Sequence, residues 1–220
     1  MMRPQHATLC IFALSAAWGS AAADSSITKV SGSIEIAAGA HEDEVSTVNG
    51  SIEVGANAVV QQAHTVNGSI RLQTQASAGE LKTVNGSVEL GEGARVSGAV
   101  HSVNGRLLVQ KGADVSGDLR NLNGRIRVSA AHVGGSIDTV AGDIELSAAR
   151  IDGGIHVHKS HGTDFDSTPP RIVIGAGSVV GGTLEFERPV KLYVSNQATV
   201  GPVKGAVAIG FSGEAPPQDR

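Results

Sequence analysis

The stretch TVNGSI occurs at Thr47–Ile52 and again at Thr65–Ile70, and it returns as TVNGSV at Thr83–Val88. Degenerate copies of this phrase flank these three, and its glycine recurs at Gly32, Gly50, Gly68, Gly86, Gly105, Gly124 and Gly142. Successive glycines are 18 or 19 residues apart throughout. A short phrase that recurs at a fixed period of this size indicates a solenoid, in which each repeat forms one coil stacked on the previous one.

Apolar and polar residues alternate around each of these glycines, as Val48, Ile52 and Val54 do with Asn49 and Glu53. Alternation with a period of two is typical of a strand that has one buried face. We therefore expect Val48, Ile52 and Val54 all to point inward, with the alternation of inward and outward residues continuing without a break through the Asn-Gly pair.

A finer period of six residues lies within each repeat. Its aliphatic positions are Val48, Val54, Val60, Val66, Leu72, Ala78, Val84, Leu90 and Val96, and after one inserted residue Val103, Val109 and Val115. Three such intervals make one coil. The sequence therefore predicts an all-β fold, a single three-sided parallel β-solenoid (β-helix) of about nine coils with 18–20 residues in each.

Equivalent side chains of successive coils should then lie above one another, about 4.8 Å apart. We expect one internal column of Ile34, Ile52, Ile70, Val88, Leu107, Ile126 and Ile144, and a second of Val96, Val115, Val133 and Ile151. The Asn-Gly pairs leave an alternative open, because they also favour tight hairpins and hence an antiparallel barrel or sandwich. The constant order of the whole phrase favours the solenoid.

Residues 1–23 have the composition of a signal peptide, with Arg3, an apolar run and a small-residue cleavage site before Asp24. We expect the chain to be exported to the periplasm or cell surface of a bacterium. The leader contains the only cysteine, Cys10, so the mature chain should have no disulfide.

The solenoid is expected over residues 24–211. The polar, proline-ended stretch near 158–170 predicts a loop insertion, and residues 212–220 predict a flexible C-terminal tail. After the leader, no segment reaches the roughly 18 apolar residues that a transmembrane helix needs.

The net charge of −4, without a basic cluster, argues against nucleic acid and anionic membranes as partners. The terminal coils of a solenoid have unpaired strand edges, which favour end-to-end self-association or capping by another envelope protein. The sequence does not exclude a glycan as a partner, but no particular motif supports one.

Outward positions should form polar columns. Five asparagines are expected to form a structural ladder, in which each side-chain amide bonds to the next coil: Asn49, Asn67, Asn85, Asn104 and Asn123. Opposite charges should also alternate between coils, as in Glu53, Arg71 and Glu89, and in the pairs Arg125 with Asp143 and Arg127 with Glu145. We interpret these alternating charges as structural, because they favour the in-register stacking of neighbouring coils.

One segment has the composition of a metal site, with His156, His158, His161, Asp164 and Asp166 close together in sequence. Imidazole and carboxylate ligands suit zinc, nickel or copper. The same residue types are also the ordinary content of a solvated loop. We predict no catalytic residue, no cofactor-binding residue and no cofactor.

Some β-helix proteins cleave polysaccharides, which keeps a carbohydrate-binding or carbohydrate-cleaving protein as the alternative function. Sugar grooves usually contain aromatic platforms, yet no Phe, Tyr or Trp occurs from Asp24 to Asp164. The remaining aromatics of the mature chain, Phe165, Phe186, Tyr193 and Phe211, are expected to close the C-terminal end of the core. We therefore expect the protein not to be an enzyme.

The repeated TVNGSI phrase behind a leader resembles a bacterial family of adhesin-type β-strand repeats of unknown function, and more distantly the bactofilins. The resemblance covers about Ile27–Ile155 well. It implies a three-sided β-helix and supplies no catalytic residues. From the regular ladders and the lack of a recognisable catalytic site in the sequence, we expect a non-catalytic envelope scaffold or adhesin-like surface protein. Typical bactofilins polymerise end to end inside the cell, whereas this chain has the leader of an exported protein.

Overall fold

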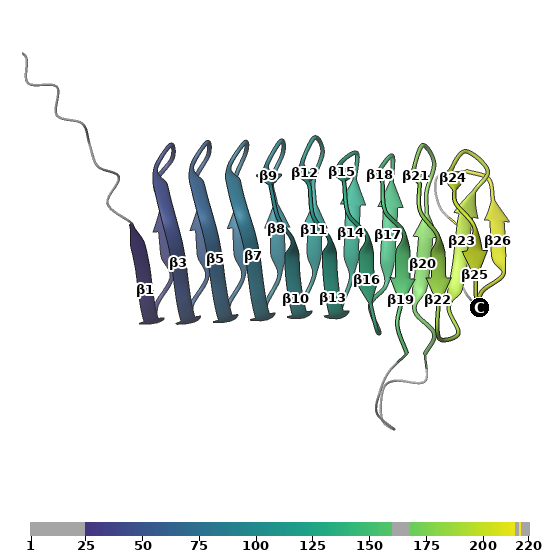
Figure 1. The fold of residues 1–220 in the computed structure, drawn as a ribbon, viewed down its shortest axis with the longest axis horizontal. Coiled ribbons are helices and arrows are strands. Elements are labelled where there is room, and N and C mark those ends of the chain that lie inside the picture. Colours follow the sequence, from purple (N-terminus) through teal and green to yellow (C-terminus); the bar gives the residue numbers. More distant parts are fainter. Residues whose placement is uncertain (1–24, 160–167, 214–215, 217–220) are drawn as a thin grey trace, which may run out of the picture.

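The computed structural model describes residues 25–159, 168–213 and 216. In these residues the chain forms 26 strands and no helix, and hence no helix that could span a membrane. Every ladder between neighbouring strands is parallel, as between β4 (Ile52–Val54) and β6 (Ile70–Leu72). The strands wind into one elongated β-solenoid, with consecutive coils side by side (Figure 1). The predicted solenoid is confirmed, and the antiparallel alternative is wrong.

One sheet contains a single strand from each coil and has ten strands in all. They are β2 (Ile34–Ile36), β4 (Ile52–Val54), β6 (Ile70–Leu72), β8 (Val88–Leu90), β11 (Leu107–Val109), β14 (Ile126–Ser129), β17 (Ile144–Ser147), β20 (Arg171–Ile174), β23 (Lys191–Ser195) and β26 (Ala208–Phe211). The molecule therefore has about ten coils, one more than predicted. The tenth coil contains β26. In this strand Ala208 and Gly210 pair with Leu192 and Val194, and because they are small, the pattern of large aliphatic residues that marks the other coils is absent from it.

A 16-stranded sheet forms the other two sides. In the first coils one long strand runs along both sides: β3 (His41–Asn49), β5 (Val59–Asn67) and β7 (Ser77–Asn85), with β1 (Ser26–Ser31) beside β3. Later coils have two short strands instead. On one side these are β9 (Arg95–Val96), β12 (Asp114–Val115), β15 (His132–Val133), β18 (Arg150–Ile151), β21 (Val179–Val180) and β24 (Thr199–Val200). On the other they are β10 (Val100–Asn104), β13 (Leu119–Asn123), β16 (Ile137–Thr139), β19 (Ile155–Val157), β22 (Leu184–Phe186) and β25 (Val203–Lys204).

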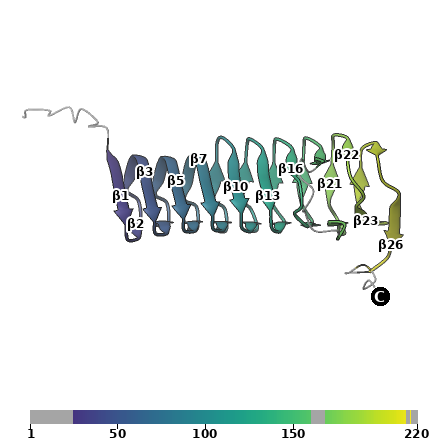
Figure 2. The same ribbon diagram turned by 90° about the horizontal axis from the view of Figure 1, so that it is seen from below.

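The internal columns follow the 18- and 19-residue spacing. Ile52 pairs with Ile34 and Ile70 in register, and the column continues through Val88 to Ile144. Val96, Val115, Val133 and Ile151 form the second column. Both columns are almost fully buried, and the core between the three sides is aliphatic. The turned view in Figure 2 shows the same regular stacking from another side.

The prediction that Val48, Val66 and Val84 point inward is wrong. Val48 is 42% exposed, whereas Thr47 beside it is 2% exposed. The alternation of inward- and outward-facing residues shifts by one position at the Asn-Gly pair, because the chain turns a corner there instead of running straight through it. Threonine is tolerated inside because its hydroxyl donates a hydrogen bond to a backbone carbonyl one coil earlier, as from Thr65 Oγ1 to Gly50 O at 2.9 Å.

Glycine is required at this corner by the close approach of two coils. A Cβ placed on Gly86 would lie 1.9 Å from the carbonyl oxygen of Gly68. Gly68 stands in the same relation to Gly50. No side chain fits there, which explains why the glycine of the repeated phrase recurs in coil after coil.

The aromatic residues divide between two clusters. Phe186 belongs to the main core, but Tyr193 and Phe211 pack with Val173 in a second cluster. Val173 pairs with Tyr193, and the residue pairs on either side of them along the two strands face the core. Because successive side chains of a strand point to opposite faces, Val173 and Tyr193 lie on the outer face of the sheet. The expectation that the aromatics together close the end of the core is therefore wrong for Tyr193 and Phe211. Phe165 lies outside the described residues.

The insertion predicted near residues 158–170 falls between β19, which ends at Val157, and β20, which begins at Arg171. The column continues across it, because Ile144 pairs directly with Ile172. Residues 160–167 and the predicted signal peptide lie outside the described residues.

Candidate functional site

The valines excluded from the core form a column on the outer surface of one side. Their equivalents in neighbouring coils are also aliphatic: Val30, Val48, Val66, Val84, Val103, Leu122 and Val140. We name these seven residues the valine column. Five of them are exposed, from 37% at Leu122 to 73% at Val30, and Val103 and Val140 are half-buried. Six coil spacings of about 4.8 Å make the column ~29 Å long.

The five predicted ladder asparagines lie beside the valine column. Four of the five donate a hydrogen bond from the amide nitrogen to the asparagine side-chain oxygen one coil earlier, at 3.0 Å from Asn67 to Asn49 and 2.9 Å from Asn85 to Asn67. Asn104 and Asn123 continue the chain at 3.1 Å. Each linking amide uses one of its two N–H groups in the ladder, so the second can reach a partner. The valine column thus has a row of hydrogen-bonding groups along one side.

Ionisable residues follow the other side of the valine column, from His64 through Lys82, His101 and Arg120 to Asp138 and His156. Lys82 Nζ lies 2.8 Å from Glu80, and Arg120 Nη2 lies 2.6 Å from Asp118. Most of the positive charge in this row is therefore balanced by a carboxylate of the same coil.

These contacts shift the pKa values of the carboxyl groups. A hydrogen bond from Lys82 lowers the pKa of Glu80. The pKa of Asp118 is lowered mainly by the backbone N–H of Ser136 and further by Arg120. Burial lowers the pKa of His101, and the charge of Arg120 adds to this effect. Both carboxylates therefore favour the ionised form.

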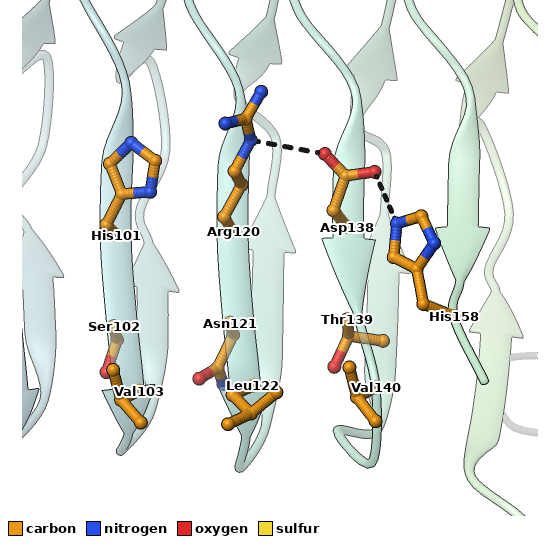
Figure 3. Close-up of a pocket in the computed structure, with 10 residues that line it drawn as sticks. All are labelled: His101, Ser102, Val103, Arg120, Asn121, Leu122, Asp138, Thr139, Val140 and His158. Carbon is orange, nitrogen blue, oxygen red and sulfur yellow. Dashed lines mark ion pairs between the residues drawn. The ribbon is translucent and has the colours of Figure 1, made fainter. Parts of the chain in front are cut away.

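A shallow groove of about 680 Å³ lies at the C-terminal end of this face (Figure 3). Val103, Leu122 and Val140 form one row of its lining. The ionisable row lies beside them, and His158 reaches back toward Asp138 from the next coil. His158 stands where the valine column would continue, so it closes the groove at this end.

Asp138 is the most enclosed charged group in the groove, with its side chain 19% exposed. Its Oδ1 lies 3.0 Å from His156 Nδ1 and 3.5 Å from His158 Nε2. Its Oδ2 lies 3.5 Å from Arg120 Nε. The carboxylate therefore holds one arginine and two histidines in place along the rim.

The structure places only part of the predicted metal set. His156 and His158 share the carboxylate of Asp138, and their ring centroids are 6.2 Å apart. His161, Asp164 and Asp166 lie outside the described residues. In residues 25–159 and 168–213, no group of three or more His, Cys, Asp or Glu side chains is arranged to hold a metal ion. A metal site therefore stays a prediction.

The predicted charge pairs differ in their contacts. Arg71 pairs with Glu89 at 3.0 Å and Arg127 with Glu145 at 2.7 Å, whereas Arg125 and Asp143 are 3.8 Å apart. Glu53 is equivalent to Arg71 by position but accepts a hydrogen bond from Gln73 instead, at 2.6 Å.

The valine column, Arg120 and Asp138 are the features of this face that sequence reasoning missed. The six-residue period places the valines in the core and so conceals the outer surface that they form. A usable signal is the hydroxyl residue immediately before five of the seven members, as at Thr65 and Val66, since only one of two adjacent strand residues can face inward.

Comparison with protein-family models, curated proteins and solved structures finds no match for the chain. The outer face around the valine column has three parallel rows, one aliphatic, one of amides and one ionisable. Each row is built by the same position of successive coils.

Proposed function

We propose that the protein is an exported, non-catalytic β-solenoid that acts as an envelope scaffold or adhesin-like surface protein. The observation that carries the proposal is the valine column, in which an aliphatic side chain faces outward in seven successive coils and is exposed in five of them. Contiguous apolar surface on a soluble protein is typical of an interaction site.

The shape of this face favours an extended partner. Five consecutive coils offer the same contacts at the same spacing, an apolar side chain and an asparagine amide one residue away. A partner that lies along the column can repeat one contact many times, which raises affinity without a deep pocket. We propose that this partner belongs to the bacterial envelope.

Binding to isolated cell envelopes tests the proposal. The Val66→Lys, Val84→Lys double variant places two charges in the column, and we expect it to bind about tenfold more weakly or worse, since buried apolar contact is lost. The matched control is Gln61→Lys with Thr74→Lys, two exposed positions outside the column, which should bind as the natural protein does. Equal binding of both variants would refute the role of the column.

A carbohydrate-binding protein is the second candidate, favoured by the groove. Its aliphatic row suits the C–H face of a sugar, and Arg120, Asp138 and His158 can bond to hydroxyl groups. Cleavage has less support, because glycoside hydrolysis uses a pair of carboxyl groups and Asp138 is the one carboxyl residue among the described residues that line the groove. Protease treatment of the envelopes would abolish binding to a protein partner, whereas glycosidase treatment would abolish binding to a glycan.

End-to-end association is a further part of the proposal. Among the residues that the structure describes, β24, β25 and β26 at the C-terminal end each pair on one side only, and Val207 is 86% exposed. Within the same residues, β1 and β2 at the other end also have one unpaired edge. Unpaired edges attract further strands. Light scattering should show mass rising with protein concentration, and a constant monomer mass would exclude this association.

A further inference from the structure

A second outward column begins as a serine ladder. It contains Ser33, Ser51, Ser69 and Ser87 in the first coils and then Arg106, Arg125 and Asp143. Each serine Oγ accepts a hydrogen bond from the backbone N–H of the equivalent residue one coil later. The last of these bonds runs from Arg106 N to Ser87 Oγ at 3.3 Å.

The ladder is interrupted where arginine replaces serine. Arginine has no acceptor atom, so the rungs after Arg106 and Arg125 lose the hydroxyl that would receive the next N–H. Within the described residues, the backbone N–H groups of Arg125 and Asp143 make no hydrogen bond. The ladder resumes one coil later, where Arg171 N donates to Asp143 Oδ1 at 2.9 Å.

The same two coils carry unbalanced positive charge. Arg106 and Arg125 are equivalent residues of adjacent coils, joined by the hydrogen bond from Leu107 N to Arg125 O at 2.9 Å. Like charges at such positions destabilise a sheet. The Arg106 guanidinium has no ion pair within the described part of the chain, and Arg125 reaches Asp143 only at 3.8 Å.

A hollow of about 540 Å³ opens over these residues. Its floor is bare backbone at Gly105 and Gly124, where a Cβ on Gly124 would lie 2.0 Å from the Gly105 oxygen. Pro169 and Pro170 line it as well. The residues that line the hollow thus include Arg106 and Arg125, which have no close ion pair within the described residues, and Asp143, whose backbone N–H is unpaired like that of Arg125.

We propose that this hollow binds an oxyanion, a carboxylate, sulfate or phosphate group, between Arg106 and Arg125. The guanidinium groups supply charge-assisted hydrogen bonds in a fork that matches such anions. The anion also supplies the acceptor that the interrupted ladder lacks at Arg125 and Asp143. This site is separate from the valine column and does not depend on the function proposed for it.

The test uses ¹⁵N-labelled protein titrated with sodium sulfate against sodium chloride at equal ionic strength. We expect the amide signals of Arg125 and Asp143 to shift and saturate with sulfate. Arg106→Ser should weaken this response about tenfold or more, because one charged partner is lost. It should also protect the Arg125 amide from hydrogen exchange without any anion, since the new hydroxyl restores the rung.

Arg95→Ser is the matched control. Arg95 is exposed in β9, on another side of the solenoid, and its replacement removes the same charge. The sulfate response should be unchanged in this variant. The proposal is overturned if the Arg125 and Asp143 amides of the natural protein do not respond, or if Arg106→Ser responds as the natural protein does.

Two further ligands distinguish the source of the anion. Dextran sulfate and polygalacturonate carry the group on a polysaccharide, and neutral dextran serves as the blank. Much tighter binding of either acidic polymer, at the same two amides, would identify an acidic glycan as the ligand. Equal affinity per anionic group for polymer and inorganic sulfate would identify a site for small anions.

Discussion

A buried polar residue precedes six of the seven members of the valine column, all except Val30. Its hydrogen bond explains why a polar side chain is tolerated in the core. Thr65, Thr83 and Ser102 each donate their single hydroxyl proton to a glycine carbonyl one coil earlier. Asn121 does the same through Nδ2, at 3.0 Å from Gly105 O. Its Oδ1 is buried and has no hydrogen-bond partner within the described residues.

Asn121→Thr should therefore stabilise the protein. The threonine hydroxyl would make the same bond as Thr83 and would leave no buried oxygen unsatisfied, so we expect the free energy of unfolding to rise by about 1 kcal/mol. Urea denaturation would measure the change. Asn123→Thr is the control, because it breaks the exposed asparagine ladder and should not stabilise. A loss of stability in Asn121→Thr would show that the oxygen has a partner.

The side chain of His132 links its own coil to the coils on both sides. Its Nδ1 lies 2.5 Å from Asp114 and its Nε2 lies 2.9 Å from Asp152, which also pairs with Arg150 at 2.8 Å. Only the protonated ring can donate from both nitrogens. The hydrogen bonds to Asp114 and Asp152 accordingly raise the pKa of His132, and the bond from His132 lowers the pKa of Asp152.

This arrangement predicts a pH-dependent contribution to stability. Because the pKa of His132 is raised on folding, its contribution is complete below its unfolded pKa and is lost as the pH rises through the folded pKa. The lowered pKa of Asp152 makes its contribution disappear in acid instead. The Tm difference between the natural protein and His132→Asn should be larger at about pH 5.5 than at about pH 8.5. A difference that grows in alkali would contradict the bridge.

At the scale of the strand, the sequence predicted the internal columns because aliphatic residues that recur every 18 residues fall on the same inward face of successive coils. The outer face could not be predicted in the same way. Thr65 is buried and Val66 exposed because the chain turns a corner at the Asn-Gly pair, and the buried threonine is tolerated because a carbonyl from another coil accepts its proton. The groove depends on His158, which ends the valine column from beyond the regular repeats.

Ile70 lies in the middle of the internal column in β6 and is 0% exposed. Ile70→Val should lower the free energy of unfolding by about 0.5–1.5 kcal/mol, because it removes one methylene group from a packed core. Ile70→Asp should unfold the surrounding coils, since it buries a charge without a partner. Circular dichroism during urea denaturation would compare them. Small and equal effects would mean that Ile70 does not face the core.

At the scale of the whole molecule, the coils form one continuous stack that keeps its register across the insertion between β19 and β20. The proposed binding face and the proposed oxyanion site both arise from this stacking. Each places equivalent residues of successive coils side by side, so that a single outward position becomes a row. Their geometry would be lost if neighbouring coils were shifted by one residue, because every side chain would then change face.

Spin labels along the valine column test this stacking most directly. Pairs at Val30 with Val103, Leu122 or Val140 span four, five and six coil spacings, so electron–electron dipolar distances should increase by about 4.8 Å at each step, from ~19 Å to ~29 Å. A regular increase would support in-register parallel coils with these residues outside. Distances that fail to increase along the series, or labels that unfold the protein, would contradict the account.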